Sequence, residues 1–171
     1  MQWIERLKMT HKLALVLAVP MLILGHLSLH RVMTAMEARH EAHHLGALAR
    51  LGVAVGDMVH ELQRERGASA GFLGSKGAKF QPELAAQRKR TDEKAAVLHT
   101  YLSGFDLEQY GADLQANLNE GLEHLGELQR IRSSVDGLNV PIGEMLEYYT
   151  DTNGHFLEVV PEMAKVSPNK D

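Results

Sequence analysis

Apolar residues recur at spacings of three and four along most of this chain, a pattern typical of helices that pack side by side. The strongest stripe lies near the C-terminus and consists of Ile142, Met145, Tyr149, Thr152, Phe156, Val159 and Met163. An earlier one consists of Leu45, Leu48, Leu51, Val55, Met58 and Leu62. The alternation typical of β-strands is not evident. The sequence therefore predicts an all-α fold, with an antiparallel helical bundle as its architecture.

Glycine and proline mark the expected ends of these helices. A first helix is expected to run to about residue 70, followed by a loop at Gly71, Gly74 and Gly77. Pro82 favours the start of a second helix over 84–102. A third helix is expected over 107–131 and a fourth over 142–163, with a break at 135–141.

The N-terminal segment LALVLAVPMLILGHLSL, residues 13–29, contains no formal charge. Its length is close to the roughly 20 residues that cross a bilayer core. Arg6, Lys8 and Lys12 precede it, which favours a cytoplasmic location for that flank. A cleavable signal peptide is the alternative, but no A-x-A-like site follows within a sensible distance and the apolar run is long for such a peptide. We expect a cytoplasmic stub at 1–12, a transmembrane helix at 13–30 that continues into the bundle, and an extracytoplasmic helical domain at 31–171.

Composition excludes several classes of function. Aromatic residues make up 5 % of the chain and the net charge is −4, so no nucleic-acid partner is expected. Cysteine is absent from the sequence, which excludes disulfides and thiolate chemistry.

The segment HELQRERGASAGFLGSKG, residues 60–77, places arginines where the apolar stripe should continue. Four residues after Leu62 comes Arg66 and then Ser69, whereas Arg64 should point away from the core. A buried guanidinium needs an anion or several acceptors. Two interpretations stay open: a salt bridge to an acid on a facing helix, or a site for a small planar oxyanion.

Together with AAQRKRTDEKAAVL (85–98) and LQRIRSSVDGLNVPIGEMLEYYTDTNGHFLEVV (128–160), this segment resembles the nitrate- and nitrite-sensing (NIT) domain of bacterial receptors. The resemblance implies an all-helical domain that senses nitrate or nitrite through arginines between helical bundles. Such domains stand in front of chemoreceptor, kinase, cyclase or transcription-antitermination modules. The family domain normally has two bundle halves, and this chain stops at SPNKD, where the second half would begin. The expectation is therefore an N-terminal portion, incomplete at its C-terminus.

By this resemblance Arg66 is the first candidate ligand of the anion, with Arg64 and Ser69 beside it. Arg88 and Arg132 match arginines of the family pattern and either bind the anion or brace the bundle, as surface or intrahelical ion pairs. The bound anion would neutralise inward-facing arginines that otherwise repel one another.

The expected function is a membrane-anchored sensor that binds nitrate or nitrite and passes the signal across the bacterial inner membrane, with its main domain in the periplasm. A homodimer through the first helix is expected, as is the absence of enzymatic activity, cofactor and metal. The alternative is a tethered bundle that binds no small molecule and serves in dimerisation or partner contact. In that case Arg66 should meet a carboxylate inside the fold.

Two groups of histidines are further candidates for chemistry. HEAHH, residues 40–44, formally matches the H-E-x-x-H pattern of zinc proteases, but no third ligand is evident. Chance explains it better than catalysis, with adventitious metal binding by His40, His43 and His44 as a further interpretation. His26 and His30 are expected near the outer end of the span, where they either serve a function such as haem or proton binding, or contact the interface and a neighbouring helix.

Overall fold

A computed structural model describes the backbone of residues 9–166, without the side chains at 10–12, 14–16, 19 and 166. The regular secondary structure of these residues is entirely helical. Its elements are α1 (Met9–Gly74), α2 (Gln81–Ser103), the short 3₁₀ helix η1 (Leu107–Tyr110), α3 (Ala112–Gly126), α4 (Leu128–Asp136) and α5 (Ile142–Val166). The all-α prediction is therefore confirmed. Most of the stub expected at 1–12 lies outside the described residues.

The chain divides into two compact units, Met1–Gly46 and Ala47–Asp171. Helix α1 is continuous and contributes to both, as the sequence predicts for its first helix. Within 9–166, however, no helix meets the combined length and apolarity needed to cross a membrane. The backbone over 13–30 is helical, whereas the predicted transmembrane span is not shown.

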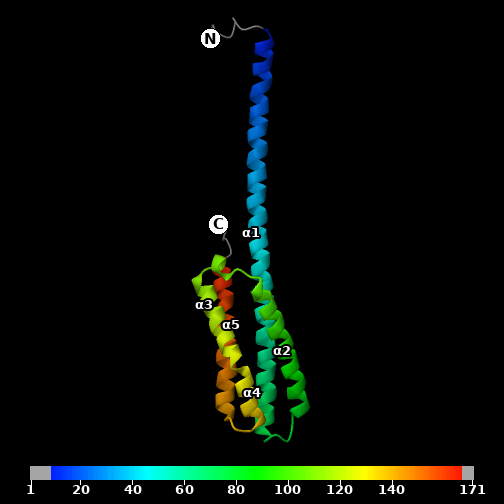
Figure 1. The fold of residues 1–171 in the computed structure, drawn as a ribbon, viewed down its shortest axis with the longest axis vertical. Helices are drawn as coiled ribbons and strands as arrows, with labels where there is room; N and C mark the ends of the chain where they lie inside the picture. Colours follow the sequence, from blue (N-terminus) through cyan, green and yellow to red (C-terminus); the bar gives the residue numbers. More distant parts are fainter. Residues whose placement is uncertain (1–8, 167–171) are drawn as a thin grey trace. The chain divides into compact units, whose positions relative to one another are not determined.

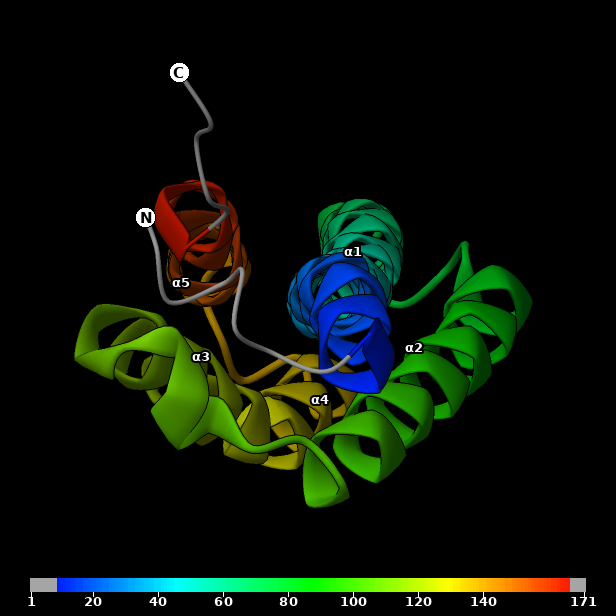
Figure 2. The same cartoon turned by 90° about the horizontal axis from the view of Figure 1, so that it is seen from above.

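The second unit is a helical bundle built from the last part of α1, α2, the α3–α4 pair and α5 (Figures 1 and 2). The last part of α1, then α2, the α3–α4 pair and α5 run in alternating directions, as predicted for an antiparallel bundle. The two apolar stripes of the sequence form much of the core, with Leu51, Val55, Tyr149 and Phe156 fully buried. Only the first members of each stripe, Leu45 and Ile142, remain exposed.

The predicted third helix is wrong as one element, because it is divided into η1, α3 and α4. Gly111 separates the first two with φ 98° and ψ 155°, a conformation that no helix contains. At Glu127 the backbone tightens instead of reversing: Glu127 N–H donates to the His124 carbonyl, and Arg130 N–H donates to that of Glu127. The apolar pattern continues through this second break, since Leu128 and Ile131 stay buried.

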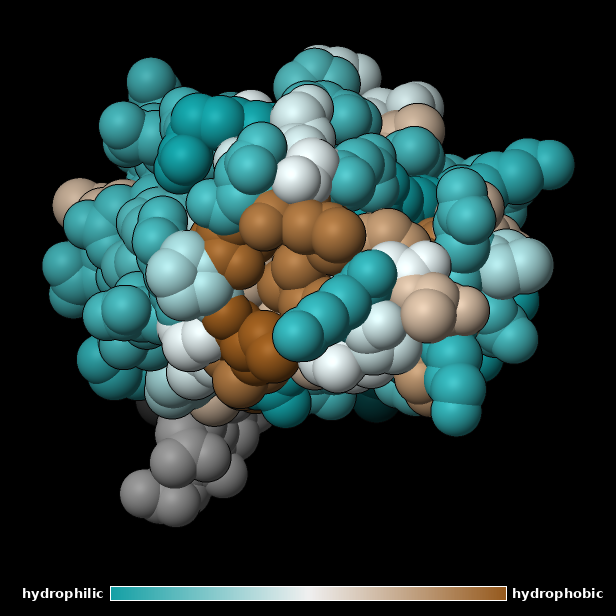
Figure 3. All heavy atoms as spheres, turned by 90° about the horizontal axis from the view of Figure 1, so that it is seen from below, coloured by the Kyte–Doolittle hydropathy of each residue, from teal (hydrophilic) through white to brown (hydrophobic). Residues whose placement is uncertain are grey.

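The loops at one end of the bundle hold three non-glycine residues in the left-handed region: Lys76, Phe80 and Leu138. Gly71 and Gly74 lie inside α1 and not in the predicted loop; a Cβ at Gly71 would come within 2.9 Å of the Phe80 ring. A larger residue at 71 would therefore force the exposed Phe80 ring to shift. Phe80 and Leu138 are also exposed, and Figure 3 shows apolar surface ringed by hydrophilic residues at this end.

Candidate functional site

The buried stripe of α1 continues past Leu62 through Glu65 and Ser69, both of which are 0 % exposed. From Met58 the steps are four, three and four, so the core position after Leu62 is three residues on. The prediction that Arg66 faces the core is therefore wrong: its side chain is half-buried and the adjacent carboxylate of Glu65 takes the buried place.

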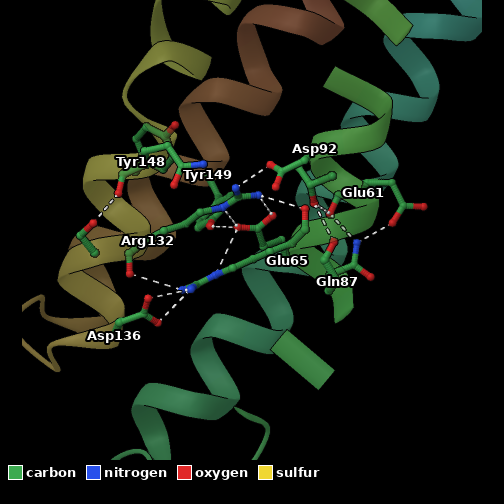
Figure 4. Close-up of polar contacts among 12 residues, drawn as sticks. Glu61, Glu65, Gln87, Asp92, Arg132, Asp136, Tyr148 and Tyr149 are labelled. Carbon is green, nitrogen blue, oxygen red and sulfur yellow. Dashed lines mark hydrogen bonds and ion pairs between the residues drawn. The ribbon is translucent and has the colours of Figure 1, made fainter. Parts of the chain in front are cut away.

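The Glu65 carboxylate binds Arg132 of α4 in a bidentate pair (Figure 4). Arg132 Nε donates to Oε1 at 2.7 Å and Nη2 donates to Oε2 at 2.8 Å. Arg132 is only 4 % exposed, so both charges are removed from solvent. From α5, the Tyr149 hydroxyl donates to the same Oε1 at 2.9 Å. A buried carboxylate thus has charge-assisted hydrogen bonds to both of its oxygens.

Two Arg–Asp pairs surround this carboxylate, and we call Arg88, Asp92, Arg132 and Asp136 the Arg–Asp clamp. In each helix the aspartate follows its arginine by four residues, but the pairing is crosswise between α2 and α4. Arg132 Nη1 donates to Asp92 at 2.6 Å, and Arg88 Nη1 donates to both oxygens of Asp136 at 2.9 and 2.8 Å. Each arginine also donates from Nη2 to the other arginine's backbone carbonyl at 3.3 Å. The expectation of a surface or intrahelical pair for Arg88 and Arg132 is corrected accordingly.

Electrostatically, the clamp and Glu65 set two guanidinium groups against three carboxylates. Burial alone would lower the pKa of Arg132, but its bonds to Glu65 and Asp92 raise that pKa above the ordinary arginine value. Burial, reinforced by the Glu65 charge, raises the pKa of Tyr149, so its hydroxyl stays protonated and can donate. These arginines are already neutralised within the fold, and the predicted repulsion between inward-facing arginines is absent at this cluster.

Arg66, one residue after Glu65, lies about 100° further around α1 and contacts the next residue of α5 after Tyr149. Its Nη1 donates to Thr150 Oγ1 at 3.2 Å, and Thr150 in turn donates to the Leu146 carbonyl at 2.7 Å. Among the described residues, no carboxylate lies within 4.0 Å of the Arg66 guanidinium. Arg66 is thus a half-buried cation whose partner is a neutral hydroxyl, and the carboxylate expected for the ligand-free alternative is not beside it.

The remaining candidates are separated from Arg66. Arg64 is exposed, as predicted, and lines a groove of about 570 Å³ between α1 and α2 with Arg90 and Gln87. Ser69 is buried, and its hydroxyl has no hydrogen-bond partner among the described residues. The structure therefore brings Arg88 and Arg132 together through Glu65, but neither to Arg66.

Sequence reasoning missed Glu65 and Thr150. An acid at a core position of the 3–4 spacing was the available signal for Glu65, and the Arg-x-x-x-Asp spacing at both 88–92 and 132–136 was the signal for the clamp. A further buried cluster was also missed, in which Gln87 donates to the carboxylate and carbonyl of Glu61. No group of three or more His, Cys, Asp or Glu among the described residues is placed to hold a metal ion, so the H-E-x-x-H pattern gains no third ligand there.

A family model described as nitrate and nitrite sensing matches residues 57–171, which is more than half of the chain. The chain belongs to the nitrate and nitrite sensing family. The matched range includes Arg66, Thr150 and the whole Arg–Asp clamp.

The structure of this member of the nitrate and nitrite sensing family is similar to the solved structure of the NasR transcription antiterminator. The TM-score is 0.71 and the sequence identity is 24 %. The similarity covers 75 % of this chain and 35 % of the NasR chain, so the present chain spans about a third of that protein. At this identity the likeness establishes the fold. A search of curated proteins finds no match.

Proposed function

We propose that this chain senses nitrate or nitrite by binding the anion at Arg66, on the surface shared by α1 and α5. The observation that carries the proposal is the state of this guanidinium: it is half-buried, it contacts a neutral hydroxyl, and no described carboxylate neutralises it. The other two family-pattern arginines, Arg88 and Arg132, are compensated inside the Arg–Asp clamp and act as braces.

The chemistry of the group suits the ligand. A guanidinium presents parallel N–H donors in a plane, which match two oxygens of a planar oxyanion. Thr150 supplies a second polar group at the same place, because its oxygen already accepts from Arg66. When an anion replaces that acceptor, the Thr150 hydroxyl can turn from the Leu146 carbonyl to donate to the anion.

Binding here would act on helix packing. Arg66 belongs to α1 and Thr150 to α5, so an anion held by both groups stabilises packings in which the two helices keep this separation. A ligand shifts such an equilibrium only by its differential affinity for the two states. Since α1 continues from the bundle into residues 9–46, we propose it as the element that passes the signal on.

We further propose that 13–30 anchors the chain in the bacterial inner membrane as part of a homodimer, with the bundle in the periplasm. The uncharged sequence and its basic N-terminal flank support this part, as does the exposure of apolar side chains such as Leu22, Leu24 and Leu27. The test is fractionation of cells that express the full chain. Recovery in the membrane fraction after alkaline carbonate washing is expected, and release into the wash would contradict the anchor without affecting the anion site.

The test of the anion site is calorimetric titration of nitrate and nitrite into the full chain, with chloride and sulfate as controls. Saturable heat selective for nitrate or nitrite is expected. Arg66→Ala should remove it, whereas the matched variant Arg64→Ala, two residues away and exposed, should retain it. Equal binding by wild type and Arg66→Ala would exclude Arg66 as the ligand. Loss in both variants would assign the heat to the surface charge of α1.

A further inference from the structure

His40 and His44, one turn apart in the first unit, place two imidazole nitrogens side by side. The distance between their Nε2 atoms is 2.9 Å, and their rings lie 4.3 Å apart at an interplanar angle of 77°. Residues four apart share one face of a helix, so both nitrogens lie over the same stretch of surface. In the neutral state one ring donates its N–H to the other.

The distance between the two Nε2 atoms limits the coordination geometry of a metal ion that both could bind. With metal–nitrogen bonds of about 2.05 Å, two nitrogens this far apart subtend an angle of about 90° at the metal. A tetrahedral ion such as Zn²⁺ would need about 3.3 Å between them. Right angles belong to the square-planar and tetragonal sites of Cu²⁺ and Ni²⁺, and Cu²⁺ has the highest affinity for imidazole donors among the divalent first-row metals.

The neighbouring charges are compatible with a cation. Glu37 lies seven residues before His44 and three before His40, on the same side of α1, while Arg39 lies on an adjacent face. His43 is different: its ring centroid is 6.4 Å from that of His44 and it is exposed on another face. It therefore offers a matched control within the same turn.

We infer that His40 and His44 form a two-nitrogen chelate for Cu²⁺ or Ni²⁺, with water completing the coordination. No redox step or catalysis is involved: the ring that donates from Nε2 takes the Nδ1–H tautomer, both neutral rings bind the metal through Nε2, and the metal links two successive turns of α1. The site lies within 9–46 and the anion site within the bundle unit, so it does not rest on the proposed function. It differs from the protease interpretation of HEAHH because it needs neither a third protein ligand nor Glu41.

The test is titration of the full chain with Cu²⁺, Ni²⁺ and Zn²⁺, followed by calorimetry and by electron paramagnetic resonance of the Cu²⁺ form. Wild type should bind Cu²⁺ most tightly and show hyperfine coupling to two imidazole nitrogens. His40→Ala and His44→Ala should each weaken Cu²⁺ binding by on the order of tenfold or more, because the second nitrogen acts at high effective concentration. Alanine favours helix, so circular dichroism should be unchanged in both.

His43→Ala is the control and should bind as wild type does. Three results would overturn the inference: an equal loss in His43→Ala, unchanged affinity in His40→Ala and His44→Ala, or Zn²⁺ binding as tight as that of Cu²⁺. The first two would mean adventitious capture by surface histidines. The third would mean that the right-angle geometry does not select the metal.

Discussion

Glu65 and Arg66 are neighbours in the chain but belong to two electrostatically opposite regions. Glu65 lies in the core, where Arg132 and Tyr149 satisfy it from α4 and α5. Arg66 lies at the α1–α5 surface, where the one side-chain partner it has among the described residues is the Thr150 hydroxyl. A single residue step along the helix, a rotation of about 100°, thus separates a charge that holds the bundle together from a charge that contacts a neutral hydroxyl.

The largest effect should come from removing the buried carboxylate. Glu65→Ala leaves the Arg132 guanidinium buried without its main counterion, which should lower the free energy of unfolding by about 3–5 kcal/mol. Urea denaturation followed by circular dichroism measures this loss. A change below 1 kcal/mol, roughly the value of a surface pair, would break the distinction between the two regions.

Replacing the whole buried group should recover most of that loss. In the triple variant Glu65→Leu, Arg132→Met and Tyr149→Phe, no buried charge or hydroxyl of the group remains unpaired. Exchange of a buried ion pair for apolar residues of similar volume is often neutral or stabilising by about 1–4 kcal/mol. The same denaturation assay applies, and nitrate titration of this variant would sharpen the comparison, since the Arg66 site should keep its affinity.

Asp92 and Glu65 allow an exposed and a buried carboxylate to be compared, because both bind the same arginine, Arg132. Asp92 binds Arg132 like Glu65, but its side chain is 55 % exposed. Asp92→Asn should therefore cost about 0–1 kcal/mol, and that cost should fall as salt is raised. Unfolding measured at low and high ionic strength tests this, with Glu65→Ala as the reference whose cost should be nearly independent of salt.

The smallest change in stability is expected at Arg66 itself. Arg66→Ala removes one hydrogen bond from a half-buried position and leaves no charge unpaired, so the free energy of unfolding should change by about 0.5 kcal/mol or less. Thermal and urea unfolding measure it. A loss of several kcal/mol would show that Arg66 serves the bundle, and its effect on anion binding would then have to be attributed to unfolding.

Much of the fold could be predicted from the sequence because apolar spacing reports directly on helix packing. The stripe from Met145 to Val159 is buried as expected, and α2 begins one residue before Pro82. The division of the third helix was missed because its apolar pattern continues through the break at Glu127, where only the hydrogen-bond pattern changes.

The site was harder to predict, for a physical reason. The residues of a buried helical stripe are three or four positions apart. A step of four after Leu62, where the structure has a step of three, placed the expected core position at Arg66 and not at Glu65. The partners of Arg88 and Arg132 could not be identified from one helix alone, since Asp92 and Asp136 exchange partners across α2 and α4. The Arg-x-x-x-Asp spacing marks both helices but is compatible with pairs inside each helix as well as between them, and the packed bundle decides for the second.

The reciprocity of the Arg–Asp clamp has a consequence for how the chain finds one packing among many. Leucine-rich helices can slide past one another by a turn, about 5.4 Å, and still bury apolar surface. In such a shifted register Arg132 would lose Asp92 together with the backbone carbonyl of Arg88, and Glu65 would be buried opposite the wrong turn of α4. The charges thus select the register of the helices, because they destabilise shifted alignments that the apolar residues alone would tolerate.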